Sequence, residues 1–253
     1  MFLDKPSQWK ELRERLLNQK VIGLDSEFYG VDFSEGQSCV NLATIDVWSV
    51  AISSGVWHPR RYHTAKGCVL PFDAIHYLHD VLVNPDIKKA CHNSGVDRHA
   101  FLNAGVRVKG IVNTLSMARW IVPGRETYNL DDLSKDLLGS GKADSFQELF
   151  VRDKIELVNI PKKSKKCFCG LVGCRKRKFP HDTKIEVDID NWVEKKTGKY
   201  IIPLYEVRPG HELWERYVKY AKVDAIRALE LYDYLYRRGN DTKVEILWYE
   251  NTD

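Results

Sequence analysis

Two acidic residues at the end of an apolar run are the first side chains in this sequence that could do chemistry. Asp25 and Glu27 follow residues 21–24, a short run of β-favouring character. On an extended chain, residues two apart point to the same face and lie about 6.5–7 Å apart. Two such charges repel, and burial raises the cost of each. A divalent cation between them would remove both penalties, whereas the alternative is a strand that ends in a solvated acidic turn.

Two further acids lie on later predicted helices. Asp97 lies in the first turn of a helix predicted over residues 96–104, where a carboxylate also interacts favourably with the helix dipole. Asp224 lies in a long helix predicted over residues 212–238, and Tyr220, four residues earlier, shares its face. The apolar neighbours of Asp224 indicate partial burial, where an unpaired carboxylate is costly. Carboxylate oxygens alone favour Mg²⁺ or Mn²⁺ over zinc as the compensating ion.

Short strands and amphipathic helices alternate around these acids. Further helices are predicted over residues 7–18, 72–83, 113–121 and 129–139. Strands are predicted over residues 21–28, 40–46, 48–52, 56–58 and 88–93. This alternation predicts an α/β fold with a sizeable core.

The order and local sequence of the acids resemble the DEDD superfamily of 3′→5′ exonucleases. Its first motif, Asp-x-Glu at the end of an aliphatic strand, is matched by residues 24–28 (LDSEF). Its second, an Asn before an Asp at a helix start, is matched by residues 92–97 (HNSGVD). Its third, Tyr-x-x-x-Asp, is matched by residues 220–224 (YAKVD) and marks the tyrosine subclass, which includes ribonuclease D and the proofreading domains of family A DNA polymerases. One departure is Asn113, where many relatives have Asp before Thr, but this position is not a metal ligand in the family pattern.

The resemblance implies a ribonuclease H-like mixed sheet flanked by helices, and hydrolysis of phosphodiester bonds with two Mg²⁺ or Mn²⁺ ions. By this resemblance Asp25 bridges both ions, while Glu27 and Asp224 hold the first. Asp97 supports the second ion directly or through water. Such a pair, about 3.5–4 Å apart, stabilises the attacking hydroxide and the leaving 3′-oxygen together.

The resemblance also gives roles to two uncharged side chains. Tyr220 would hydrogen-bond the attacking water and orient it, although a core tyrosine on an apolar helix face is the alternative. Asn93 would contact the terminal nucleotide of the substrate.

The composition is that of an ordinary soluble globular protein, with 43% hydrophobic and 29% charged residues in 253. No apolar run approaches the length of a membrane span. The first residues lack the charged-then-apolar pattern of a signal peptide. We therefore expect an intracellular protein with no membrane partner, in a compartment that the sequence does not specify.

Residues 160–198 are predicted to form an insertion within a single domain that covers residues 1–253. Cys167, Cys169, Cys174 and His181 offer three thiolates and one imidazole, enough for a knuckle around a structural Zn²⁺. Zinc would order a segment in which lysines and arginines repel one another. Free cysteines in a basic loop, or a different fourth ligand, are the alternatives.

Basic residues are concentrated in the same insertion. Eight lie between Pro161 and Lys178 with no acid among them, so the remainder carries −4 of the overall +4. A local basic patch suits a phosphate backbone, whereas a solvated loop is the alternative. The residues expected to bind nucleic acid are Lys165, Lys166, Arg175, Lys176, Arg177 and Lys178.

These observations predict a 3′→5′ exonuclease that acts on 3′ ends of single-stranded DNA, as in proofreading, with a polymerase as a partner. A ribonuclease D-like exoribonuclease is the close alternative, because no group that reads a 2′-hydroxyl can be identified. A non-catalytic nucleic-acid-binding module is the alternative from another class. It predicts a damaged acidic set, and the set in this sequence is complete.

Overall fold

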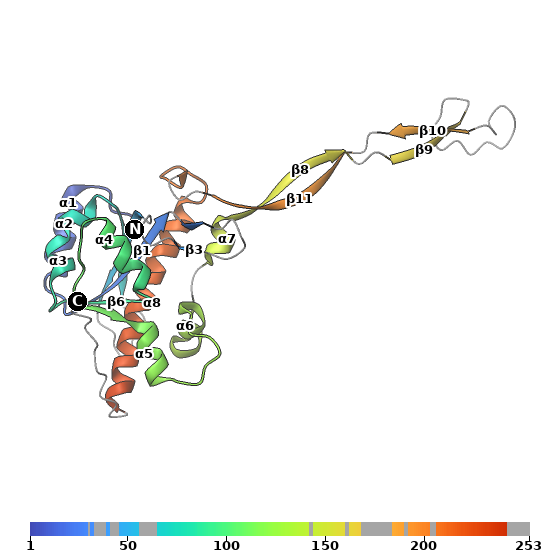
Figure 1. The fold of residues 1–253 in the computed structure, drawn as a ribbon. Helices are drawn as coiled ribbons and strands as arrows, with labels where there is room; N and C mark the ends of the chain where they lie inside the picture. Colours follow the sequence, from blue (N-terminus) through green and yellow to red (C-terminus); the bar gives the residue numbers. More distant parts are fainter. Residues whose placement is uncertain are drawn as a thin grey trace. The chain divides into compact units, whose positions relative to one another are not determined.

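The chain folds into two units in a computed structural model (Figure 1). The structure describes residues 1–29, 31–32, 39–40, 46–55, 65–141, 144–159, 162–167, 184–189, 192–202 and 206–241. The first unit comprises Met1–Leu149 and Pro203–Asp253, and the second is Phe150–Ile202.

The first unit is built on a mixed five-stranded sheet with the order β5-β4-β1-β6-β7. The central strand β1 (Val21–Tyr29) pairs antiparallel with β4 (Asp46–Ser54) and parallel with β6 (Lys88–Cys91). At the edges, β5 (Lys66–Pro71) runs antiparallel to β4, and β7 (Ile111–Asn113) runs parallel to β6. Ile22 and Leu24 are fully buried, as expected of a central strand covered on both faces.

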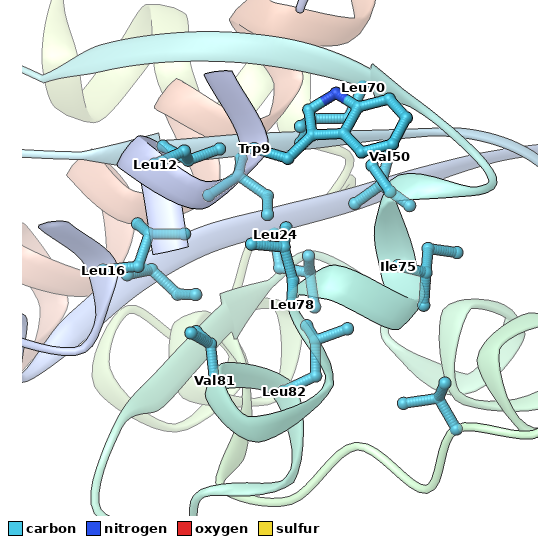
Figure 2. Packing of buried hydrophobic residues seen from close by; sticks show 14 of the residues in the cluster. Trp9, Leu12, Leu16, Leu24, Val50, Leu70, Ile75, Leu78, Val81 and Leu82 are labelled. Atoms are coloured by element: carbon cyan, nitrogen blue, oxygen red, sulfur yellow. The ribbon is translucent and has the colours of Figure 1, made fainter. Parts of the chain in front are cut away.

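Helices of the N-terminal half cover one face of this sheet. They are α1 (Pro6–Leu16), α2 (Ala74–Tyr77), α3 (His79–Val83) and α4 (Gly95–Asn103). Trp9, Leu12 and Leu16 recur at helical spacing on α1 and pack into one apolar cluster with Leu24 of β1 and Leu82 of α3 (Figure 2). This face therefore holds one continuous apolar cluster of the core.

The other face is covered by α5 (Thr114–Ile121), α6 (Leu130–Leu138) and α8 (Trp214–Asp241). Helix α8 packs against β1, β4, β5 and β6. Met117, Leu133 and Leu231, one from each helix, join Ala90 and Val112 of the sheet in a second apolar cluster. The sheet thus lies between two helical layers, which is the α/β arrangement predicted from the sequence.

Most predicted elements of this unit are present, one predicted helix is divided in two, and several elements were not predicted, the edge strand β5 among them. The segment 72–83 forms two short helices instead of one, because Leu78 leaves the helical region between them with φ −97° and ψ 7°. The short strand β7 precedes α5 and was not predicted, since three residues carry little periodicity. Of the predicted strand 40–46, residues 41–45 lie outside the described part, as does the predicted strand 56–58.

The second unit contains two antiparallel ribbons, and no strands were predicted there. Strand β8 (Val151–Asn159) pairs with β11 (Trp192–Ile201), and β9 (Lys162–Cys167) pairs with β10 (Lys184–Ile189). Helix α7 (Phe146–Phe150) precedes β8. In the first unit, β2 (Val31–Asp32) and β3 (Cys39–Val40) form a further short antiparallel pair. Among the helices of the described residues, none is long and apolar enough to span a membrane.

Candidate active site

The close approach of α8 to β1 at a glycine positions the acidic residues. A Cβ atom on Gly23 would lie 2.1 Å from the Ala225 carbonyl oxygen, so only glycine lets the helix lie this near the strand. The Ser53 hydroxyl of β4 donates to the same carbonyl at 2.8 Å. Because side chains alternate along a strand, Asp25 and Glu27 lie on the Gly23 face of β1, toward α8.

Two serines of β4 fix how α8 runs along the sheet. Ser53 pairs with Gly23 and contacts α8 at Ala225, while Ser49 pairs with Glu27 and contacts the Tyr217 hydroxyl at 2.5 Å. The four residue steps from Ser49 to Ser53 span about 13 Å of strand, and the eight from Tyr217 to Ala225 span about 12 Å of helix. The two stretches therefore have nearly the same length and lie side by side. Asp25, midway along this stretch of β1, therefore lies level with the turn of α8 that carries Tyr220 and Asp224.

The buried Tyr220 hydroxyl is acted on by the charges of the nearby carboxylates. Glu27 is 7% exposed, Asp224 is 4% exposed and Tyr220 is 8% exposed. Burial raises the pKa of the Tyr220 hydroxyl well above its ordinary value, and the negative charges of three carboxylates raise it further. These carboxylates belong to Glu27, Asp224 and Asp25. The hydroxyl consequently keeps its proton at neutral pH and can donate a hydrogen bond.

Asp97 reaches the end of β1 from α4. Ala100 and Phe101 of the same helix belong to the apolar cluster that contains α1, on the face of the sheet opposite α8. Its Oδ1 atom accepts hydrogen bonds from the Ser26 backbone N–H at 3.0 Å and from the Ser26 hydroxyl at 2.5 Å. Burial raises the pKa of Asp97 to about 6, and the two bonds from Ser26 oppose that rise. Ser26 thus anchors this carboxylate, a role that the x position of Asp-x-Glu did not suggest.

The charges of Asp97 and Asp25 both act on the buried thiol of Cys91. Burial raises the pKa of this thiol well above its ordinary value, and the charges of Asp97 and Asp25 raise it further. Across the part of the chain that the structure describes, however, no three His, Cys, Asp or Glu side chains form a group that could hold a metal ion as they stand. Asp25 thus acts on both Tyr220 and Cys91, but the four acids do not meet at one coordination point.

Asn93 lies in a strained turn between β6 and α4. Its φ of 59° makes it the one non-glycine residue with positive φ among those described, and Asn tolerates this conformation better than most side chains. Its backbone N–H donates to Oδ1 of Asn113 at 3.1 Å, and the same oxygen accepts from the Leu115 N–H at 3.1 Å. Asn113 therefore caps α5 and holds the Asn93 turn with one atom, a second role that the sequence did not reveal.

His92 ties the same turn to the segment between α5 and α6. Its Nδ1 atom lies 2.9 Å from the Thr114 hydroxyl, and its Nε2 atom lies 3.0 Å from the Tyr128 carbonyl oxygen. Asn93 is held by its bond to Asn113, and the Ser94 carbonyl oxygen accepts a hydrogen bond from the backbone N–H of Arg98 at 3.0 Å. Hydrogen bonds therefore hold three consecutive residues, 92–94, of the turn that precedes Asp97.

The predicted zinc ligands fall largely outside the described residues. Cys169, Cys174 and His181 lie there, as do the basic residues Arg175, Lys176, Arg177 and Lys178. Cys167, Lys165 and Lys166 belong to strand β9 of the second unit.

Comparison with known proteins identifies the family. Residues 1–160 match the family described as "3'-5' exonuclease". The chain belongs to this 3'-5' exonuclease family. Its members are hydrolases that remove nucleotides from 3' ends. No curated protein matches the sequence.

Three solved structures are similar in fold to this chain. The POL domain of Pol1 from M. smegmatis, in complex with DNA primer-template and dNTP, has a TM-score of 0.54 at 13% identity. Escherichia coli RNase D, "an exoribonuclease involved in structured RNA processing", has a TM-score of 0.55 at 13% sequence identity. Brucella melitensis NrnC with bound Mg²⁺ has a TM-score of 0.53 at 14% sequence identity. Each covers 96% of this chain, which spans 28%, 46% and 81% of them respectively. This likeness confirms the ribonuclease H-like α/β fold.

Proposed function

We propose that this chain hydrolyses phosphodiester bonds at the 3′ ends of single-stranded DNA, as a member of the tyrosine subclass. The observation that carries the proposal is a set of buried carboxylates, of which Glu27 and Asp224 act on the protonated Tyr220 hydroxyl and Asp97 is bonded to Ser26 of β1. Glu27, Asp97 and Asp224 are each less than 8% exposed. Burying several carboxylates together is costly unless cations compensate them.

Asp25, Glu27, Asp97 and Asp224 would hold two Mg²⁺ or Mn²⁺ ions. The donor set fits, because hard divalent cations prefer carboxylate oxygens and because burial, which raises the pKa of Asp97, makes its negative charge costly without a compensating cation. The bound Mg²⁺ in the similar NrnC structure supports this choice of ion. Bound ions would stabilise the charge that develops on the attacking and leaving oxygens. Side-chain rotations would be needed to bring the carboxylates together.

Two uncharged residues would act on the substrate directly. Tyr220, which keeps its proton, would orient the attacking water by hydrogen bonding. Asn93, exposed on its strained turn, would contact the terminal nucleotide. The hydrogen bond from its backbone to Asn113 would keep that contact in place.

The substrate sugar distinguishes two forms of the proposal. Similarity to Pol1 bound to DNA supports a DNA end and a polymerase partner, whereas similarity to RNase D supports an RNA end. Matched single-stranded DNA, duplex DNA and RNA, each labelled at the 5′ end, would separate them. We expect single-stranded DNA to shorten stepwise with Mg²⁺ and to stay intact with EDTA. Faster shortening of RNA would favour the ribonuclease D-like alternative.

The variant Asp25→Asn tests the site itself. It should abolish Mg²⁺-dependent shortening while the circular dichroism spectrum stays unchanged. Glu11→Gln on the exposed face of α1 removes one charge on the opposite helical layer and serves as the matched control. Shortening by Asp25→Asn at the wild-type rate would refute the site. A wild-type protein that binds oligonucleotides and never shortens them would instead be the non-catalytic binding module.

We also propose that the basic insertion contacts the nucleic acid and that Cys167, Cys169, Cys174 and His181 hold a structural Zn²⁺. Elemental analysis of the purified chain tests the zinc site. About one zinc per chain is expected, and freely reactive cysteines in a zinc-free protein would refute it.

A further inference from the structure

Charge is divided unequally between the two units. Residues 150–202 contain fourteen basic and seven acidic side chains, so this segment carries +7, and the rest of the chain carries −3 of the overall +4. The unit that holds the carboxylates is therefore itself negative when no cation is bound to it. The second unit carries the excess positive charge, which favours contact with nucleic acid.

The register of β9 and β10 separates the lysines of that unit into two kinds. Lys163 is paired with Asp188 and Lys165 with Glu186, so each of these lysines lies directly opposite a carboxylate residue. The lysines at positions 162 and 166 are paired instead with Ile189 and Ile185. Ser164, between them, is paired with Val187.

Because directly opposed residues share a face and successive residues alternate, the ribbon has two different faces. One carries Lys163 and Lys165, whose paired positions are the acids Asp188 and Glu186, so the net charge of these paired positions is zero. The other carries Lys162 and Lys166 among β-branched apolar residues and no acid. On this second face, called here the basic–apolar face, nothing at a paired position competes with a phosphate for either lysine.

We propose that the basic–apolar face of the β9–β10 ribbon, with Lys162 and Lys166, binds the phosphate backbone of the single-stranded substrate. The proposal rests on the proposed function and refines it, since the sequence had grouped Lys165 with Lys166. Among the described strands, β9 pairs with β10 alone, and an isolated two-stranded ribbon is marginally stable. A strand of nucleic acid on the apolar residues would therefore also order the ribbon.

Two double variants with equal charge change test the proposal. Lys162→Gln/Lys166→Gln should lose two phosphate contacts, and Lys163→Gln/Lys165→Gln should lose none. Binding of a labelled single-stranded oligonucleotide is measured by fluorescence anisotropy in EDTA, across a series of salt concentrations. Each lost contact lowers the slope of log K against log salt by about 0.7, so the first variant should lose about 1.4. At 0.1 M salt this corresponds to about 25-fold weaker binding.

Lys163→Gln/Lys165→Gln should keep the wild-type slope, because its lysines make no phosphate contact. Lys162→Arg/Lys166→Arg should bind like the wild type, which excludes a loss caused by misfolding. Equal slopes for the two glutamine variants, or failure of the arginine variant to bind, would overturn the proposal. Since the assay needs no hydrolysis, a chain that binds in this way and does not shorten DNA would refute the proposed function alone.

Discussion

Replacing Asp97 by Asn should stabilise the metal-free protein at neutral pH and abolish its activity. The carboxylate is 5% exposed, and its pKa of about 6 lies about two pH units above the ordinary value for Asp. Each unit corresponds to about 1.36 kcal/mol, so the ionised side chain costs the fold about 3 kcal/mol. Asn keeps the Oδ1 acceptor for both hydrogen bonds from Ser26 and carries no charge.

The sign follows from proton linkage. The folded state holds the Asp97 proton more tightly than the unfolded state, so the free energy of unfolding falls as pH rises from about 4 through 6. Below pH 4 both states are protonated and wild type and variant should be about equally stable. Above pH 7 the variant should be more stable by up to about 3 kcal/mol. Urea unfolding in EDTA at several pH values measures this difference.

The carboxylate of Asp80 supplies the control for this reasoning. A hydrogen bond from Arg13 lowers the pKa of Asp80, so its effect on folding has the opposite sign. Asp80→Asn should therefore lose stability above pH 4, where Asp97→Asn gains it. An Asp97→Asn variant that is less stable than wild type at pH 8 would show that burial of this charge is not costly in the metal-free protein.

Three further predictions concern the packing and chemistry of the site. Gly23→Ala should lose about 3 kcal/mol in urea unfolding, because its Cβ would meet the Ala225 carbonyl, whereas Gly95→Ala, with no atom within 4 Å of its Cβ, should lose none. Asn113→Ala should raise KM more than it lowers kcat, because the Asn93 turn loses its anchor, and Asn113→Asp should restore both; identical kinetics in Asn113→Ala would remove Asn113 from the site. Tyr220→Phe should lower kcat about 10- to 100-fold with little change in KM, and an unchanged kcat in single-turnover assays would leave Tyr220 a core residue.

The parts of the site that depend on local sequence were predictable. Residues 21–24 and the acids after them form a strand for reasons contained in that segment, and β1 covers it. Asn129 and Gly139 likewise bound α6, since Asn129 accepts from the Asp132 N–H and Gly139 takes the left-handed conformation with φ 76°.

The parts that depend on how elements pack were not predictable. The sequence indicates only that Gly23 permits a close backbone approach. The position of α8 shows which element approaches, because a Cβ atom on Gly23 would clash with the Ala225 carbonyl oxygen. Ser26 and Asn113 act on residues 71 and 20 positions away, which no local pattern encodes. Strand β9 of the second unit was missed because its sequence, KKSKKC, lacks the apolar alternation that marks a strand. The sequence of β10, KIEVDI, does alternate and could have indicated a strand.

The cost of burying carboxylates and the capacity to bind cations are two aspects of one arrangement. The burial that raises the pKa of Asp97 and Tyr220 also makes a cation between these acids more favourable than it would be at the surface. Metal binding should therefore stabilise the fold, and the gain should grow with metal concentration. Asp97→Asn, which removes the cost, should also reduce the gain. Its unfolding curve should respond less to Mg²⁺ than that of the wild type, and an equal response would place the ions away from Asp97.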